Sequence, residues 1–323
     1  MTNRYARQMV LPEIGEAGQA RLAAASVLVV GAGGLGSPVL QYLAGAGVGR
    51  LTILDHDTVE ETNLHRQPLY GMKDIGAAKA GAARNALLGV NPGIAIEAIV
   101  ARLVPQNVAG LVDAANVVVD AADNFAVTYM LSDACFAIGK PLVSASALGL
   151  SGYAGAYCGG GASYRAVFPD APRNPGNCAT NGVLGSVVAV VGGLQAQMVL
   201  HLLLDLQPSV LGRVVTFDAR RMAFGGFGFA SSPEPGEFAP FIAADAVTSA
   251  DLVVDLRGFD EAPISPFAGA VRIGVEGIEA VGGPSTASRR IVLACRSGQR
   301  ALQAASRLRE IGHNDLALVA LGD

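Results

Sequence analysis

The first half of the chain alternates between short hydrophobic runs rich in β-branched residues and longer stretches with hydrophobic residues at helical spacing. The short runs predict strands at residues 26–30, 50–54, 116–120 and 141–144. The longer stretches predict helices at residues 37–46, 76–88 and 126–138. Strands that alternate with helices form a mainly parallel sheet covered on both faces, so we predict an α/β, Rossmann-like fold.

The pattern changes after Leu150. SGYAGAYCGGGASYRAVFP predicts antiparallel strands joined by a glycine turn, and RVVTFDARRMAF predicts a further strand, so the sheet gains an antiparallel extension. Residues 225–241 are rich in Gly, Ser and Pro without a period, which indicates a linker. The alternation then restarts in DLVVDLRG and RIVLACRSGQRALQAASRLREIG. We therefore predict a domain at residues 1–224, a linker at 225–247 and a small α/β domain at 248–323.

One hydrophobic segment, residues 182–204, is long enough for a membrane span and holds no Asp, Glu, Lys or Arg. It contains Ser186, Gln195, Gln197 and several glycines, and it lacks flanking basic or aromatic anchors. We interpret it as a buried helix of a soluble protein, with a dimer contact as one possible location, and we expect no membrane association.

The composition narrows the choice of partners. Hydrophobic residues make up 51% of the chain and charged residues 15%, against about 25% charged residues in typical proteins. Such a chain can bury a large core and a subunit contact. A net charge of −4 and the absence of Lys/Arg runs argue against nucleic acid. The start, MTNRYARQMV, lacks the apolar core of a signal peptide, so we expect a cytoplasmic protein.

A glycine-rich turn follows the first predicted strand, in VLVVGAGGLGSP. Gly31, Gly33 and Gly36 fit GxGxxG, and Asp55 ends the next strand, which is the context of dinucleotide binding. Glycines permit the tight turn and let backbone N–H groups approach phosphate oxygens. Taken alone, this turn favours a nicotinamide-dependent oxidoreductase.

The residues beyond Asp55 indicate a different chemistry. Asn63, Arg66 and Lys79 follow it closely, and Asp123 and Asn124 come just past another strand end. Arg and Lys neutralise a triphosphate, and an Asp at a strand end suits Mg²⁺, which takes carboxylates together with phosphate oxygens. This combination favours phosphoryl or nucleotidyl transfer over hydride transfer.

Six motifs in this order then resemble the ThiF/MoeB/HesA family, the bacterial relatives of ubiquitin-activating enzymes. They are RYARQMVLPEIGEAGQARL, VLVVGAGGLGSPVLQYLAGAGVG, LDHDTVEETNLHRQ, DIGAAKA, DAADNF and NCATNGVLGSVVAVVGGLQA, and they cover about residues 4–224. The resemblance implies Mg-ATP-dependent adenylation of the C-terminal glycine carboxylate of a small ubiquitin-like sulfur-carrier protein that ends in Gly-Gly. It also implies a persulfide donor, such as a cysteine desulfurase.

The resemblance assigns roles to residues of this chain. Asp55 binds the ribose hydroxyls, Asp123 binds Mg²⁺, and Arg7 reaches into the partner subunit's site, which implies a homodimer. Gly34 and its neighbours approach the nucleotide, and the phosphate contacts are Asn63, Arg66 and Lys79.

The chain departs from the family pattern at two places. Many relatives hold a structural zinc with two CxxC pairs, but Ser163 and Ala166 stand at the first pair and no cysteine stands at the second. We therefore expect no zinc. Thr128 replaces an arginine of the family pattern DNFxTR, which puts one polar contact near the magnesium site in doubt.

Two of the four cysteines are candidates for sulfur chemistry. Cys178 matches a family cysteine that in some members is linked covalently to the carrier, while a non-essential loop cysteine is the alternative. Cys295 in VLACRSGQRA resembles the active loop of rhodanese sulfurtransferases, and VVDLRG (with Asp255 and Arg257) and FAGAVRI also match that family. We expect loop N–H groups, Arg296 and Arg300 to lower the pKa of the Cys295 thiol.

For the remaining residues we predict structural roles, and several alternative interpretations stay open. The rhodanese-like domain is short and lacks most of an acidic helix, so a degenerate domain with a buried cysteine is an alternative. Cys135 and Cys158 lie on core patterns, and we assign no chemistry to His56 and His65. An NAD(P)-dependent oxidoreductase and a non-catalytic carrier-binding scaffold stay as alternatives. The pathway, molybdopterin, thiamine or a related one, is left open.

Overall fold

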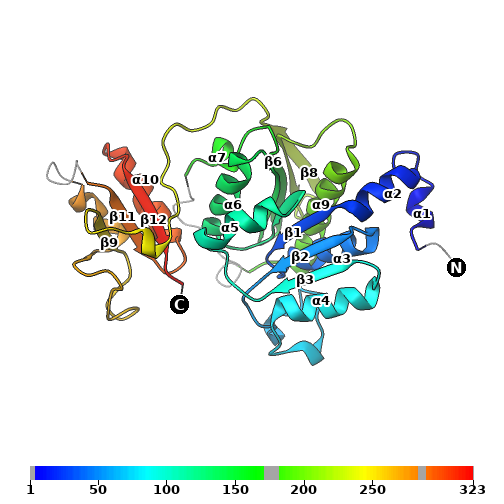
Figure 1. The fold of residues 1–323 in the computed structure, drawn as a ribbon, viewed down its shortest axis with the longest axis horizontal. Coiled ribbons are helices and arrows are strands. Elements are labelled where there is room, and N and C mark those ends of the chain that lie inside the picture. Colours follow the sequence, from blue (N-terminus) through cyan, green and yellow to red (C-terminus); the bar gives the residue numbers. More distant parts are fainter. Residues whose placement is uncertain (1–3, 171–181, 283–288, 323) are drawn as a thin grey trace.

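A computed structural model describes residues 4–170, 182–282 and 289–322. Its main feature is an eight-stranded sheet with strand order β3-β2-β1-β4-β5-β6-β7-β8 (Figure 1). The strands are β1 (Ser26–Val30), β2 (Arg50–Leu54), β3 (Ala95–Ile99), β4 (Val117–Asp120), β5 (Pro141–Leu148), β6 (Ser151–Cys158), β7 (Arg213–Asp218) and β8 (Ala223–Gly228). The pairs from β3 to β5 are parallel and those from β5 to β8 antiparallel, which confirms the predicted mainly parallel sheet with an antiparallel extension.

Helices cover both faces of the parallel part. Along β1, Val27 and Val29 face one core and Leu28 and Val30 face the other, because successive side chains point to opposite faces. The first face is covered by α3 (Gly36–Ala46), α4 (Lys79–Val90) and α9 (Gly185–Leu204). The second face is covered by α5 (Pro105–Asp113) and α6 (Phe125–Ala137).

Two sequence expectations for the antiparallel part are wrong. The segment after the glycine turn is a short helix, α7 (Tyr164–Val167), because the Ser163 side chain accepts the Ala166 N–H at its start. The single strand expected in RVVTFDARRMAF is the hairpin of β7 and β8. Asp218 accepts the N–H groups of two following arginines and so closes a turn there. Strand β8 runs to Gly228, inside the expected linker.

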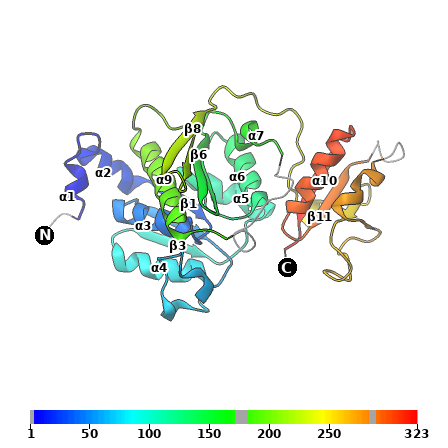
Figure 2. The same cartoon turned by 180° about the vertical axis from the view of Figure 1, so that it is seen from behind.

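Helix α9 is the segment for which a membrane span was considered. By length and composition it could cross a membrane, but half of its apolar window is buried (50%). It packs against α3, β5 and β6 (Figure 2). Only a glycine fits at position 192, because a Cβ there would lie 2.4 Å from Pro38 and 2.9 Å from the Leu35 carbonyl oxygen. This is the environment that we predicted for a core helix.

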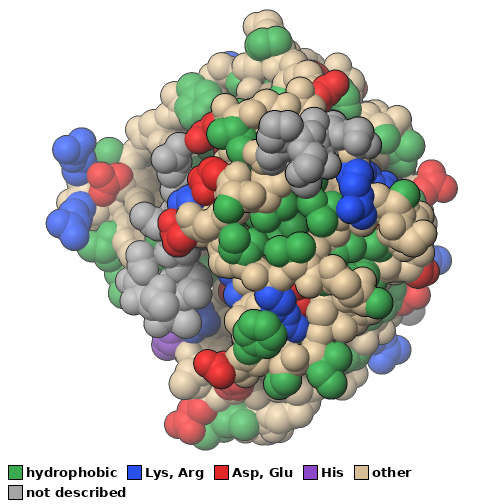
Figure 3. All heavy atoms as spheres, turned by 90° about the vertical axis from the view of Figure 1, so that its left-hand side faces the viewer, with side chains coloured by type: hydrophobic (Ala, Val, Ile, Leu, Met, Phe, Trp, Pro, Cys, Tyr) green, Lys and Arg blue, Asp and Glu red, His purple; other side chains and the backbone are tan. Residues whose placement is uncertain are grey.

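In the described part of the C-terminal unit, residues 248–282 and 289–322, the strands form a four-stranded sheet with order β10-β9-β11-β12 and parallel pairs. Its elements are β9 (Leu252–Asp255), β10 (Val271–Arg272), β11 (Ile291–Cys295), α10 (Gln299–Glu310) and β12 (Leu316–Ala320). Viewed from this end, hydrophobic side chains lie among scattered charged ones (Figure 3). Phe259 and Ile264 are exposed apolar residues of this unit.

The two sheets are joined through one hydrophobic core. Residues of α5 and α6 and residues of α10 and β11 belong to the same buried cluster, and α10 contacts α6. Both ribbon views show the C-terminal unit beside α5 and α6, while α1 (Ala6–Met9) and α2 (Gly15–Ala24) lie at the opposite end of the molecule (Figures 1 and 2). The segment between the two units therefore connects parts of the chain that are in direct contact through α6 and α10.

Candidate functional site

The glycine turn between β1 and α3 is tight in the way that the GxGxxG spacing predicts. Gly31 has φ +94°, a conformation that side chains disfavour. A Cβ at Gly31 would lie 2.7 Å from the Ala121 carbonyl oxygen, and one at Gly36 would lie 2.1 Å from the Gly31 oxygen. The turn that follows β1 is therefore pressed against the turn that follows β4.

The turn offers backbone donors beside a buried acid. Within the described residues, the N–H groups of Gly33 and Gly34 have no acceptor, and both glycines are partly exposed. Asp55, at the end of β2, accepts the N–H of Ala32 (2.7 Å) and of Asp57 (2.8 Å). Burial raises the pKa of Asp55 above its usual value, although these bonds and Lys79 oppose the shift. Free N–H groups at a helix start suit phosphate oxygens.

A cation and an acid are paired next to Asp55. Lys79, the first residue of α4, is buried and its Nζ lies 3.0 Å from Asp57 Oδ2. Burial by itself would raise the pKa of Asp57, but the hydrogen bond and charge of Lys79 bring it below its usual value. Asp57 was not among the sequence candidates. A phosphate group that binds Lys79 would have to displace the Asp57 carboxylate from it.

Asn63 and Arg66 lie in the segment that joins β2 to α4. Asn63, in the 3₁₀ turn Glu61–Asn63, accepts the Glu60 N–H. Arg66 donates to the Thr62 carbonyl oxygen (3.1 Å), and its Cδ would lie 3.7 Å from a Cβ at Gly34. Arg66 is therefore held beside the glycine turn by its own local backbone, and Asn63 is fixed within the 3₁₀ turn that precedes it.

Sequence reasoning missed Gln67, which directly follows Arg66. Its side chain is buried, its Oε1 has no hydrogen-bond partner among the described residues, and its Nε2 would lie 3.6 Å from a Cβ at Gly33. A buried amide oxygen without a partner is costly, so its position beside the turn indicates a polar ligand. It also missed that the ligand atoms of Asp55, His56 and Asp57 lie within 4.8 Å of one another.

The turn after β4 carries Asp123 and is built on Asp120. Asp120 is fully buried; its Oδ1 accepts the Ala122 N–H (3.2 Å) and its Oδ2 the Ser144 hydroxyl (2.8 Å). Asn124 caps α6 by accepting the Ala126 N–H. Asp123, between these anchors, is exposed. A carboxylate presented in this way beside the glycine turn fits the oxygen ligands that Mg²⁺ prefers.

Thr128, which departs from the family pattern DNFxTR, contacts the buried Asp120. Thr128 is buried, and its hydroxyl bonds to the Asp120 carboxyl and lies 3.5 Å from the Asn124 carbonyl oxygen. The Thr128 hydroxyl therefore contacts the Asp120 carboxyl at the position where the family pattern has a positively charged arginine. Burial raises the pKa of Asp120 to about 6, against the hydrogen bonds of Thr128 and Ser144.

This raised pKa makes the stability of the protein depend on pH. Above the ordinary pKa of 3.8, the folded state still holds a proton on Asp120 that the unfolded state has lost. The contribution of Asp120 to the free energy of unfolding therefore falls as the pH rises toward about 6. We expect the unfolding free energy of wild type, relative to Asp120→Asn, to fall by about 2 kcal/mol between pH 4.5 and 7.5. Urea titrations of both proteins across this range measure the difference, and parallel curves would show that Asp120 does not titrate there.

Two predicted residues are not part of this cluster. Arg7 is exposed on α1, where Gln8 donates to the Ala46 carbonyl oxygen and Tyr5 covers Gly47, at the far end of α3. Helix α3 has 11 residues, so this end is about 16 Å from the glycine turn by the helical rise. Arg7 therefore does not reach the turn of its own chain. Cys178 lies outside the described residues.

The positions of the family's zinc cysteines carry a hydrogen-bonded contact. The backbone N–H and hydroxyl of Ser163 both donate to Glu234 (2.7 and 2.6 Å), and Ala166 offers no ligand atom. Arg165 next to them binds Asp133 through two nitrogens and stacks between the Tyr129 and Phe238 rings. Ser163 and Ala166 supply neither of the two thiolates that a CxxC pair gives to a structural zinc site.

Cys295 ends β11 in the C-terminal unit, as predicted. It is fully buried, and the Gly298 N–H donates to its Sγ (3.1 Å). The expectation of a lowered pKa is wrong: burial raises the pKa of the thiol, and this outweighs the loop N–H groups and Arg300. Arg300 is held by Glu261 through two hydrogen bonds.

Cys135 and Cys158 are core residues, as predicted, and Asp255 is a buried acid that pairs with an arginine. Cys135 and Cys158 are free and buried, and burial raises the pKa of Cys158 to about 12. Asp255 is buried and bound by Arg257 through two hydrogen bonds of 2.9 Å, which, against the effect of burial, keep its pKa below the usual value.

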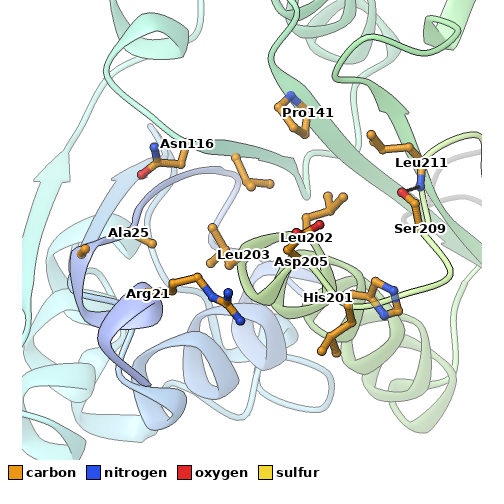
Figure 4. A pocket seen from close by; sticks show the side chains of 13 residues that line it. Arg21, Ala25, Asn116, Pro141, His201, Leu202, Leu203, Asp205, Ser209 and Leu211 are labelled. Atoms are coloured by element: carbon orange, nitrogen blue, oxygen red, sulfur yellow. Dashed lines mark hydrogen bonds between the residues drawn. The ribbon is translucent and has the colours of Figure 1, made fainter. Parts of the chain in front are cut away.

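A separate cavity of about 490 Å³ lies at the amino ends of β4 and β5 (Figure 4). Arg21, His201 and Asp205 line it, and the first two are engaged by the Leu204 and Pro208 carbonyl oxygens. In parallel α/β sheets, ligands bind at the carboxyl ends of the strands. The candidate site is therefore the cluster at the glycine turn and not this cavity.

Comparison with known proteins agrees with this geometry. The ThiF family profile matches residues 5–235. The chain is 50% identical over 224 residues to adenylyltransferase and sulfurtransferase MOCS3 of Bos taurus, covering 68% of this chain and 49% of that protein. It is 42% identical over 235 residues to the SAMP-activating enzyme E1 of Haloferax volcanii, covering 72% and 87%. The chain thus spans about half the length of the MOCS3 relatives.

Solved structures support the fold. A complex titled E. coli MccB + MccA-N7isoASN has a TM-score of 0.63 at 24% identity and covers 72% of this chain and 74% of that one. E. coli MccB + ATP has a TM-score of 0.61 at 23% identity, with 72% and 73% covered. At this identity the likeness concerns the architecture only.

Proposed function

Because this chain belongs to the ThiF family, we propose that it uses Mg-ATP to adenylate the C-terminal glycine carboxylate of a small ubiquitin-like sulfur-carrier protein. The names of its relatives, an adenylyltransferase with sulfurtransferase activity and a SAMP-activating enzyme, support this choice. We further propose that residues 1–224 act as the adenylation domain and residues 248–323 as a rhodanese-like sulfur-transfer domain. A persulfide donor, such as a cysteine desulfurase, would load the latter.

The observation that carries the proposal is the mixed charge around the glycine turn. Arg66 lies beside Gly34, and Lys79 pairs with Asp57 next to Asp55. Asp123 is exposed on the adjoining turn. A hydride-transfer site needs the turn and Asp55 but no second acid with two cations. A triphosphate with its metal needs all of them.

The chemistry that we propose follows from these charges. A carboxylate oxygen of the carrier attacks the α-phosphorus of ATP, and the bond to the bridging oxygen breaks so that pyrophosphate leaves. Mg²⁺ bound at Asp123 would supply charge neutralisation for the phosphates. Arg66 and Lys79 stabilise the departing pyrophosphate, and Lys79 leaves Asp57 to do so. No general base is needed, because a carboxylate is already ionised at neutral pH.

The sulfur step uses the acyl-adenylate. The terminal sulfur of a Cys295 persulfide attacks the acyl carbon and AMP leaves with the electrons of the broken C–O bond. A second thiol then attacks the Cys295 sulfur, which releases the carrier thiocarboxylate and leaves a disulfide on Cys295. Cys178 is our candidate for a covalent link to the carrier. We expect the reaction in the cytoplasm and in a homodimer.

The test is ATP–pyrophosphate exchange with purified protein and a carrier that ends in Gly-Gly. We expect exchange that depends on both Mg²⁺ and the carrier, and a carrier without its last glycine is the matched control. Absence of exchange together with tight NAD binding would favour the oxidoreductase. Carrier binding without exchange would favour a scaffold. Gene neighbours that encode such a carrier would identify the pathway.

A further inference from the structure

The loop that follows Cys295 is packed against the other unit of the same chain. Gly298 has φ +84°, and a Cβ there would lie 2.6 Å from Ala126 Cβ and 2.7 Å from the Phe241 ring. The loop therefore touches the start of α6 on one side and the interdomain segment on the other. No space for even a methyl group is left between them.

This contact lies close to the candidate magnesium residue. Ala126 is three residues after Asp123, and three peptide units span at most about 11 Å. Asn124 between them caps α6 through the Ala126 N–H. The Cys295 loop is thus docked beside the adenylation site of its own chain.

Three further contacts join the C-terminal unit to the rest of the chain. Asp170 accepts hydrogen bonds from Arg309 (2.6 Å) and Ser306 (2.8 Å) of α10, the helix that begins right after the loop. Residues 240–242 bond to Leu318 of β12 through two backbone hydrogen bonds. Gly322 lies against Arg102, which follows β3. Helix α10 and the end of the chain are therefore held against the N-terminal unit, and β12 is held against the interdomain segment.

This docking bears on Cys295 because a thiol must be reached in order to react. The Cys295 side chain is fully buried, and Gly298 of the loop that follows it lies directly against Ala126 of α6 and the Phe241 ring. Thiol–disulfide and persulfide exchange requires direct approach of the attacking or departing sulfur. In the docked arrangement that approach is blocked.

We propose that the structure is a closed arrangement in which the N-terminal unit shields Cys295, and that Asp170 latches it through Arg309 and Ser306. Asp170 is half-exposed, and an ion pair of this kind is worth little, so the latch can open reversibly. Opening uncovers Cys295 beside the nucleotide site of the same chain. The role of Cys295 rests on the proposed function, whereas the shielding does not.

The test is the rate at which iodoacetamide alkylates Cys295 in the full chain, followed by peptide mass spectrometry. Asp170→Arg places two cations face to face, and we expect Cys295 to react about fivefold faster than in wild type. Adding Arg309→Asp restores the pairing and should return the rate toward the wild-type value. Glu276→Arg breaks an ion pair of α10 that lies within the C-terminal unit, and it should leave the rate unchanged.

Hydrogen exchange at the start of α6 and in residues 295–300 reports the docking itself. We expect both to exchange faster in Asp170→Arg and not in Glu276→Arg. Faster exchange without faster alkylation would overturn the shielding, because Cys295 would then be buried by its own unit. Equal alkylation in all variants, or an equal rise in Asp170→Arg and Glu276→Arg, would overturn the latch. Neither readout needs ATP or carrier, so failure of the proposed function is recorded separately, by pyrophosphate exchange.

Discussion

Asp123→Ala should lower carrier-dependent ATP–pyrophosphate exchange by about a thousandfold, equal to about 4 kcal/mol of lost transition-state stabilisation. The side chain is exposed on a turn whose two ends are anchored by Asp120 and Asn124. Removing it therefore takes a metal ligand away while the turn keeps its shape. The free energy of unfolding should change by less than about 0.5 kcal/mol, as for other surface substitutions.

The matched control is Asp113→Ala, an exposed aspartate at the end of α5. It removes the same charge from the same unit, and exchange should stay near the wild-type rate. Raising Mg²⁺ should recover part of the activity of Asp123→Ala if the residue binds the metal. Exchange within a factor of a few of wild type would exclude Asp123 from the metal site.

The parts of the fold that the sequence predicts well are those determined by local patterns. Strands 26–30 and 50–54 appear at the predicted bounds, because a run of buried β-branched residues between turn signals has few alternatives. The glycine turn can also be predicted from a local motif, because a Cβ at Gly31 or Gly36 would clash with neighbouring backbone atoms. The hairpin after β7 was missed because its turn depends on one aspartate that bonds two N–H groups.

The parts of the site that escaped prediction depend on contacts between distant segments. Lys79 could be identified as a cation for phosphate, but its pairing with Asp57 appears only when α4 folds back on β2. The pKa of Cys295 was predicted in the wrong direction. Loop N–H groups can be inferred from sequence, but the burial that outweighs them depends on what packs over the loop. Pattern analysis identifies functional groups better than it identifies their surroundings.

Arg7 offers the sharpest test of the predicted homodimer. It lies at the end of α3 opposite the glycine turn, so any role in catalysis requires the site of a partner subunit. Arg7→Ala alone should lower exchange by about a hundredfold or more, as for loss of a group that stabilises transition-state charge. A dimer of one Arg7→Ala chain and one Asp123→Ala chain then contains one site with both residues intact. Purified through two different tags, this heterodimer should regain about half of the wild-type rate per dimer.

The control for this experiment is a heterodimer of Lys79→Ala and Asp123→Ala chains. Both residues belong to the glycine-turn cluster of a single chain, so each site of that dimer lacks one of them and the rate should stay low. The two heterodimers carry the same number of substitutions and differ only in whether a lost side chain can come from the partner. Recovery in the first and not in the second would therefore place Arg7 in the partner's site. Low rates in both would confine every catalytic group to one chain, and α1 would then have a structural role at the end of α3.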